Sequence, residues 1–253
     1  MTDNATPAST APALPPFYRN PAPLDAARHG RIGLRANSSL AFARDTNAIL
    51  LTTSEFALAA RNYPIVFSTG GQTVPFVIVG LRDRENLFVD AAGKWSDDTY
   101  IPAYVRRYPF IFSETQDSTR LLLCMDEGAE CLDPESQQPF FTDGKPSAVL
   151  QDVLKFCEAF QAQYRDTLEF GQWLDKNGML EDRIALAELE GGQSFTLSGF
   201  RLLNTQKLRA LEDAQVLELH KRGWLPLMHF HLQSLNNLGP LNRMTRSRPR
   251  QAA

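Results

Sequence analysis

The stretch NLFVDAAGKWSDDTYIPAYVRRYPF, residues 86–110, crowds aromatic side chains, two prolines and two adjacent arginines into a segment that is too dense for an ordinary surface loop. Its apolar run 87–89 predicts a short strand, and Asp90 to Gly93 predict a turn. Pro102 is well placed to open a short helix to about Arg107, which Pro109 would end. The stretch therefore predicts a strand, a turn and a short helix in succession.

Around this stretch, residues 48–126 contain short apolar runs separated by turn residues, which predicts β structure. Ser54–Arg61 predicts one short helix within this region, with Ser54 as its N-cap. Two pairs of runs predict antiparallel hairpins: 65–67 with 74–81 around Gly70 and Gly71, and 110–112 with 121–125 around Asp117 and Ser118.

The middle of the chain, residues 147–177, predicts one long amphipathic helix. Ser147 can cap its start, and Asn177-Gly178 can end it. Gaps of three and four separate its apolar residues, as expected for one buried helix face. These residues are Leu150, Val153, Leu154, Cys157, Phe160, Tyr164 and Leu168, with Trp173 and Leu174 beyond.

The last part, residues 183–238, predicts a hairpin around Gly191-Gly192 followed by helices, with Thr205 as one cap and Pro226 opening the final helix. Strands, a long helix, a short hairpin and further helices in this order favour an α+β fold rather than a βαβ repeat. We expect one domain over residues 17–242. Composition predicts that residues 1–16 form a disordered arm and that the arginine-rich residues 243–253 form a disordered basic tail.

Composition restricts the class of protein. Hydrophobic residues make up 43% of the 253 residues, so a packed core is expected. A formal net charge of −3 argues against nucleic-acid binding, which needs a basic face. No apolar run reaches the roughly 20 residues of a membrane-spanning helix, and residues 1–16 lack the positive charge of a secretory signal.

The three cysteines, Cys124, Cys131 and Cys157, form no C-x-x-C pair, and a sparse odd number is typical of a reducing compartment. We therefore expect a cytoplasmic protein. A disulfide between Cys124 and Cys131 across a turn is the alternative.

Several stretches resemble the SapC family of bacterial proteins. They are FYRNP at 17–21, RNYPIVF at 61–67, ENLFVD at 85–90, YIPAYVRRYPF at 100–110, LCMDE at 123–127, LSGFR at 197–201 and HLQSLNNL at 231–238. The resemblance covers about residues 17–242. It implies an association with bacterial surface layers and their export, and with TonB-dependent receptors, tryptophan-halogenase-like proteins and cupin-like oxygenases. It supplies no catalytic residues and no cofactor.

The strongest candidate site is a ligand-binding region made of Tyr104, Arg106, Arg107 and Tyr108, with Trp95 and Asp90 nearby. Tyrosine and tryptophan offer rigid contact area, and arginine offers a planar fork for a carboxylate or phosphate. Such a groove suits an anionic small molecule, a partner protein or a peptide. In the alternative interpretation the aromatic rings fill a core and the arginines pair with nearby carboxylates.

The other chemically interesting residues favour structural roles. Asp90 is explained by turn chemistry, and Asp97 and Asp98 form no defined acid–base pair. His220, His229 and His231 lack the spacing of a helical metal site, His29 stands alone, and Cys157 falls on an apolar helix face. We expect no metal site. The sequence favours a non-catalytic binding protein, with an enzyme of unknown reaction, acting beside halogenase-like or oxygenase-like partners, as the alternative.

Overall fold

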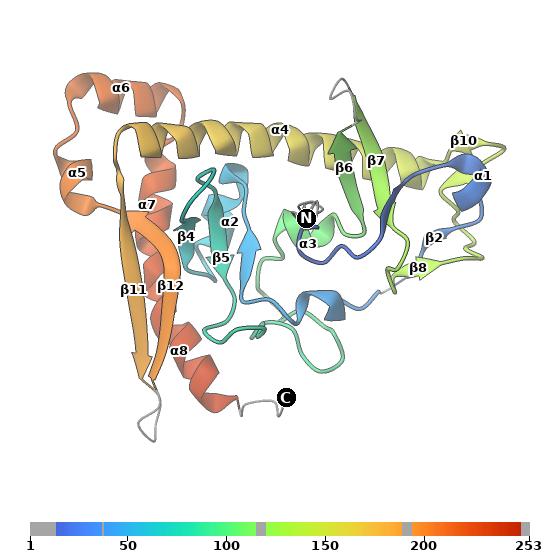
Figure 1. The fold of residues 1–253 in the computed structure, drawn as a ribbon, viewed down its shortest axis with the longest axis horizontal. Helices are drawn as coiled ribbons and strands as arrows, with labels where there is room; N and C mark the ends of the chain where they lie inside the picture. The colour runs from blue at the N-terminus through green and yellow to red at the C-terminus, as the bar shows by residue number, and fades with distance from the viewer. Residues whose placement is uncertain (1–13, 37, 115–119, 189–193, 249–253) are drawn as a thin grey trace, which may run out of the picture.

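The computed structural model of the chain describes residues 14–36, 38–114, 120–188 and 194–248. The structure combines helices with antiparallel sheets that lie along one long helix, which confirms the predicted α+β class (Figure 1). Four predicted turn residues, Asp117, Ser118, Gly191 and Gly192, lie outside the described residues.

The larger sheet has five antiparallel strands in the order β11-β12-β4-β5-β3. The predicted hairpin of β4 and β5 is confirmed, and Gly70 and Gly71 in its turn adopt positive φ angles of 72° and 58°. The strands are β3 (Ala48–Leu50), β4 (Ile65–Ser68), β5 (Pro75–Ile78), β11 (Leu180–Glu188) and β12 (Ser194–Leu203).

A second sheet has three antiparallel strands in the order β1-β7-β6, and two small ribbons lie beyond it (Figure 1). Strands β6 (Phe110–Glu114) and β7 (Leu121–Asp126) form the second predicted hairpin. The remaining strands are β1 (Pro21–Pro23), β2 (Gly33–Leu34), β8 (Leu132–Asp133), β9 (Phe141–Thr142) and β10 (Lys145–Pro146).

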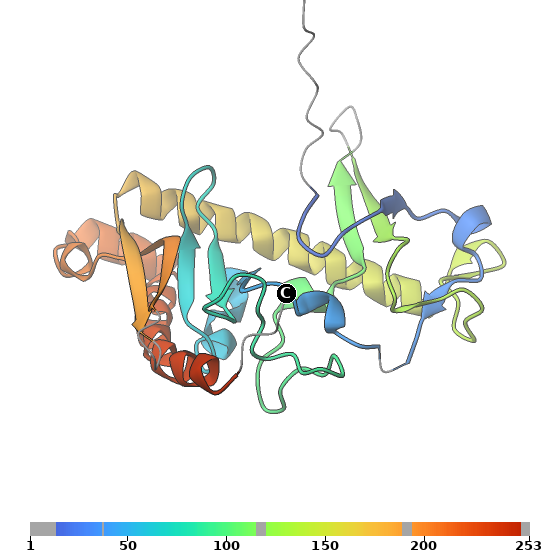
Figure 2. The ribbon, with the colours of Figure 1, turned by 60° about the horizontal axis from the view of Figure 1, so that its bottom comes forward.

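Helix α4 (Ala148–Lys176) connects the two sheets, and both Figure 1 and Figure 2 show it running past each of them. Ser147 caps it by accepting the N–H of Leu150, and Gly178 after its end has a φ of 57°. Its buried face belongs to two cores: Phe160 and Leu174 pack with the five-stranded sheet, whereas Leu150 and Cys157 pack with the three-stranded one. One predicted amphipathic helix therefore holds both parts together.

The other helices are short and cover the five-stranded sheet or connect strands. Helix α7 contacts both β4 and β12. Within the described residues, no helix combines the length and the apolarity needed to cross a membrane. The helical segments are α1 (Ala26–His29), η1 (Ala41–Ala43), η2 (Thr53–Glu55), α2 (Phe56–Ala59), α3 (Ala103–Arg106), α5 (Thr205–Arg209), α6 (Asp213–Lys221), α7 (Leu225–Ser234), η3 (Leu235–Asn237) and α8 (Leu238–Ser247).

Local side-chain hydrogen bonds correct three predictions. Residues 87–89 form no strand beyond the single bridge Val89–Trp95, because the side chain of Asn86 accepts the N–H of Phe88 and holds a loop. The helix predicted at Ser54 is capped by Thr52 instead. The cap of α5 is Asn204, not Thr205, because the Asn204 side chain accepts two backbone N–H groups.

The C-terminal segment is more ordered than its composition predicts. Helix α8 extends to Ser247, so residues 243–247 are helical and not part of a disordered tail. Leu241 and Thr245 are buried on this helix. Arg82 donates to the carbonyl of Thr245, and Arg248 donates to the carbonyl of Asn86. These contacts anchor the helix to the loop before residue 87.

Candidate functional site

The carboxylate of Glu55, which is 4% exposed, anchors the start of the segment 100–110. Its Oε1 accepts from the N–H of Ala103 at 2.6 Å and from the hydroxyl of Tyr100 at 2.9 Å. Its Oε2 accepts from the N–H and the hydroxyl of Thr52, both at 2.8 Å. Ala103 opens α3, and Pro102 makes no side-chain cap there, so Glu55 supplies an acceptor for this helix end from another segment.

A second buried carboxylate, Asp126, anchors the end of the same segment. Its Oδ2 accepts from the N–H of Arg19 at 2.9 Å and from the hydroxyl of Tyr108 at 3.2 Å. Its Oδ1 accepts from the N–H of Asn20 at 2.9 Å and from that of Gly128 at 3.2 Å. The two buried acids are thus satisfied by backbone N–H groups and by the hydroxyls of tyrosine and threonine.

The arginines of the segment do not pair with carboxylates, which corrects one part of the structural interpretation of this stretch. Neither Arg106 nor Arg107 forms an ion pair with any residue that the structure describes. The exposed Arg106 donates to the carbonyl of Ile101 and to the hydroxyl of Tyr100, both at 3.0 Å. Its guanidinium carbon lies 5.3 Å from the centre of the Phe156 ring. Arg106 is therefore held in place by two of its N–H groups, and its other N–H groups remain available to a ligand.

Arg107 lies in a cage of aromatic rings. Its guanidinium carbon is 4.4 Å from the ring centre of Tyr104, 4.5 Å from that of Phe160 and 5.8 Å from that of Tyr18. Its Nε is buried and has no hydrogen-bond partner among the described residues. Cation–π contacts stabilise such a guanidinium without neutralising its charge.

The acids around Arg107 are protonated and cannot neutralise it either. Burial raises the pKa values of the Tyr18, Tyr104 and Tyr164 hydroxyls above their ordinary value. Burial also raises the pKa of the Cys157 thiol to about 11. At neutral pH these four neighbours of the half-buried cation are consequently neutral, and no carboxylate among the described residues pairs with it.

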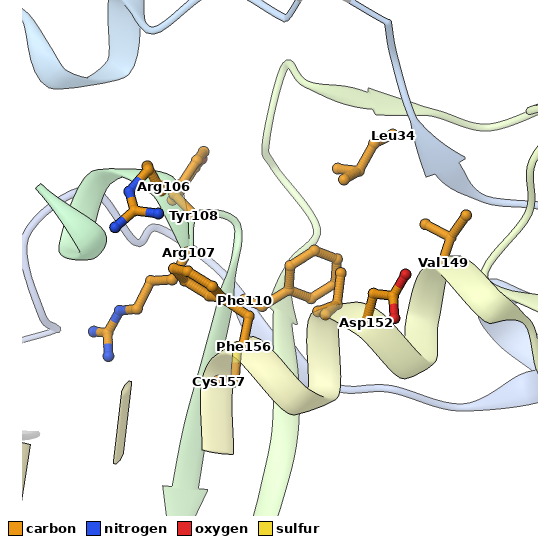
Figure 3. Close-up of a pocket in the computed structure, with 10 residues that line it drawn as sticks. Leu34, Arg106, Arg107, Tyr108, Phe110, Val149, Asp152, Phe156 and Cys157 are labelled. Atoms are coloured by element: carbon orange, nitrogen blue, oxygen red, sulfur yellow. The ribbon is translucent and has the colours of Figure 1, made fainter. Parts of the chain in front are cut away.

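A pocket of about 330 Å³ opens beside these arginines, between α3 and α4 (Figure 3). Figure 3 shows Arg106 and Arg107 at one end and Leu34, Val149 and Asp152 at the other. Leu34 is 37% exposed, so this end faces solvent. The pocket is lined by Leu34, Arg106, Arg107, Tyr108, Phe110, Val149, Asp152, Val153, Phe156 and Cys157.

The structure brings together only some of the candidate ligand-binding residues. Arg106, Arg107 and Tyr108 line the pocket, and Tyr104 forms a wall of the cage around Arg107. Trp95 does not line it: it is buried, and its indole N–H donates to the hydroxyl of Tyr63 at 3.1 Å. Trp95 therefore belongs to the hydrophobic core, together with Tyr63.

Asp90 also lies outside the pocket. Its Oδ1 accepts the N–H of Lys94 at 2.9 Å, so the side chain closes the turn as the structural interpretation predicts. Asp97 pairs with Lys94 at the surface, at 2.8 Å, and Asp98 sits in a turn with a φ of 59°. These three carboxylates therefore supply no acid–base pair to the candidate site.

The histidines have structural or solvent-exposed positions. His231 is fully buried and accepts the N–H of Leu203 at 3.1 Å, which confirms its predicted structural role. His29 is buried with its Nε2 3.0 Å from a carboxylate oxygen of Glu127. His220 and His229 are exposed. Within the described ranges, no three His, Cys, Asp or Glu residues are grouped so that they could hold a metal ion.

The three cysteines are buried free thiols, so the alternative of a Cys124–Cys131 disulfide is wrong. Cys157 lies at the base of the pocket. Its raised pKa keeps the thiol protonated at neutral pH, and a protonated thiol is a poor nucleophile. This confirms the prediction of an inert buried cysteine on the apolar face of α4.

Sequence reasoning missed the apolar half of the pocket. Leu34 is distant in sequence from the arginines, and nothing in its surroundings marks it. Val149 and Phe156 lie beside the periodic apolar stripe of α4 and not on it. Apolar residues outside such a stripe indicate a second apolar surface on the helix, and this was the signal that could have revealed the pocket. Tyr18, which covers Arg107, lies in one of the stretches used for the family resemblance but carries no functional signal of its own.

A family model described as SapC matches residues 24–241, which include α3, α4 and the whole lining of the pocket. No curated protein and no solved structure matches the chain.

Proposed function

The chain belongs to the SapC family, and from this premise we propose that it is a non-catalytic accessory protein that binds a peptide, a protein or an anionic small ligand in the pocket between α3 and α4. The observation that carries the proposal is the state of Arg107. A half-buried cation without an anion is costly, since burial removes water that would otherwise solvate it. An anionic group on a ligand would supply the missing partner.

The surroundings of the pocket favour binding over catalysis. Both buried carboxylates, Glu55 and Asp126, already accept four hydrogen bonds each and hold the backbone. The Cys157 thiol is protonated at neutral pH. A general base or a nucleophile needs a free lone pair aimed at the substrate, and these groups do not offer one. The two guanidinium groups are suited to recognition.

Titration of the protein with a panel of small carboxylates, phosphates and short peptides with free C termini tests this site. We expect the methyl NMR signals of Leu34, Val149 and Val153 to shift with at least one class of probe. Arg107→Gln should weaken that binding by roughly tenfold to a hundredfold, because a charge-assisted hydrogen bond is lost. Arg243→Gln, an exposed arginine on α8, is the matched control and should bind as the wild type does. Unmoved methyl signals, or equal binding by Arg107→Gln, would count against the proposal.

The cellular context is proposed from the family alone: a cytoplasmic accessory of a bacterial surface-layer or outer-membrane transport system. We expect cross-linking in the source bacterium to recover a component of such a system with the wild-type protein and much less of it with Arg107→Gln. Deletion of the gene should reduce export or uptake by that system. If no partner is recovered and transport is unchanged, the proposed cellular context is wrong. The ligand titration remains the separate test of the pocket.

A further inference from the structure

The charged side chains that line the pocket are distributed unevenly. Arg106 and Arg107 extend from α3 at one end, whereas Asp152 projects from α4 near the other end (Figure 3). The Asp152 side chain is 79% exposed, and its Oδ1 lies 3.4 Å from Nζ of Lys155. That pair is exposed and therefore screened by solvent, and Lys155 does not line the pocket. A ligand at the arginines would meet one negative charge at the rim.

The walls between the charged ends are apolar. Leu34, Val149, Val153 and Phe156 keep part of their surface open there, and Phe110 and Cys157 lie buried beneath them. The volume of about 330 Å³ is near the lower limit of the roughly 300–1,000 Å³ that ligand pockets occupy. A dinucleotide is too large for this space, whereas a short alkyl chain, an aromatic ring or one terminal side chain is not.

We infer that the pocket takes an anionic group on an apolar body, such as a carboxylate on an alkyl or aryl group, and that Asp152 reduces the advantage that a second negative charge on the ligand would gain at the arginines. This inference rests on the proposed binding function of the same pocket. A guanidinium fork donates hydrogen bonds to carboxylates and phosphates alike. The attraction of the two arginines and the repulsion by Asp152 both increase with the charge of the ligand, so Asp152 offsets part of the gain that a doubly charged ligand makes at the arginines.

Two sources provide this chemistry: a free small acid, and the C-terminal carboxylate of a peptide whose last residue is apolar. Both place one carboxylate at the arginines and one apolar group between Leu34 and Phe156. Titrations with octanoate and with an acetylated peptide ending in Ala-Leu separate the two sources. The corresponding amides, octanamide and the peptide amide, keep the apolar body and remove the charge.

Asp152→Asn tests the discrimination. Wild type and variant are titrated with octanoate and with octyl phosphate at about pH 8, where the phosphate carries nearly two charges because its second pKa is near 6. The variant should bind octanoate roughly threefold more tightly and octyl phosphate roughly tenfold more tightly, since the same repulsion acts on one charge and on two. Asp166→Asn, an exposed acid on α4 outside the pocket, should change neither affinity.

The outcomes separate this inference from the proposed function. Binding of octanoate alone, of the free-acid peptide alone or of both supports the inference and identifies the source. Amides that bind as well as acids, or equal affinity changes for the two anions in Asp152→Asn, would overturn it while the pocket remains a binding site. Failure of every acid, phosphate and peptide to bind would contradict the proposed function itself.

Discussion

Glu55→Gln is expected to lower the free energy of unfolding by about 3–5 kcal/mol, although the two side chains have the same shape. Both carboxylate oxygens of Glu55 accept two hydrogen bonds each, so every lone pair faces a donor. Glutamine replaces one oxygen by an NH₂ group. In one orientation of the amide, the NH₂ group faces the N–H of Ala103 and the hydroxyl of Tyr100. In the other orientation, it faces the N–H and the hydroxyl of Thr52.

Urea denaturation followed by circular dichroism measures this loss. Glu158→Gln, an exposed acid on α4, is the matched control and should change stability by less than about 0.5 kcal/mol. Thr52→Val removes a single donor to Glu55 and should cost about 1–2 kcal/mol, so it provides a folded variant if Glu55→Gln does not fold. A loss below about 1 kcal/mol for Glu55→Gln would show that this carboxylate is not the anchor of α3.

Acidification from pH 6.5 towards pH 4 is expected to remove about 3 kcal/mol of stability through His231 alone. Burial lowers the pKa of this imidazole from 6.5 to about 4. Its Nε2 accepts the N–H of Leu203, so the folded state requires the neutral ring. Between these two pH values the unfolded chain binds the proton and the folded chain does not. The stabilisation is therefore complete above pH 6.5 and is lost as the pH falls towards 4.

The slope of stability against pH is the measurement that isolates this histidine. His231→Gln keeps an acceptor but cannot titrate, so its free energy of unfolding should fall less steeply between pH 6.5 and about pH 4.5 than that of the wild type. His220→Gln and His229→Gln, which alter exposed rings, should keep the wild-type slope. Equal slopes for His231→Gln and wild type would contradict a buried neutral His231, whatever the absolute stabilities.

Local patterns were enough to predict most of the secondary structure. The three- and four-residue spacing of apolar residues predicts α4 almost to its ends, because a helix that buries one face must repeat at that interval. Gly70 and Gly71 predict the β4–β5 turn, since the turn requires positive φ. The caps were less predictable: Thr52 prevails over Ser54 because Glu55 completes a capping box with it.

The candidate site was only partly predictable. The tyrosines and arginines of residues 104–108 are neighbours in sequence, and α3 keeps them together. Their partners come from elsewhere: Tyr18 from the N-terminal segment, Phe160 from α4 and Leu34 from a short ribbon. Trp95 and Asp90 belong to the same stretch, yet a buried hydrogen bond and a turn place them outside the pocket.

The α+β class, the long helix, the hairpins and the family were predictable from the order of residues, because they depend on short-range periodicity and on contiguous motifs. Which polar groups have partners became visible only in the folded chain. Glu55 and Asp126 receive donors from distant segments and thereby hold the stretch 100–110 at both ends. Arg107 receives aromatic rings and no carboxylate from the residues that the structure describes. Hydrogen bonds and charge compensation depend on distances in space, and only the packing of both sheets against α4 sets those distances.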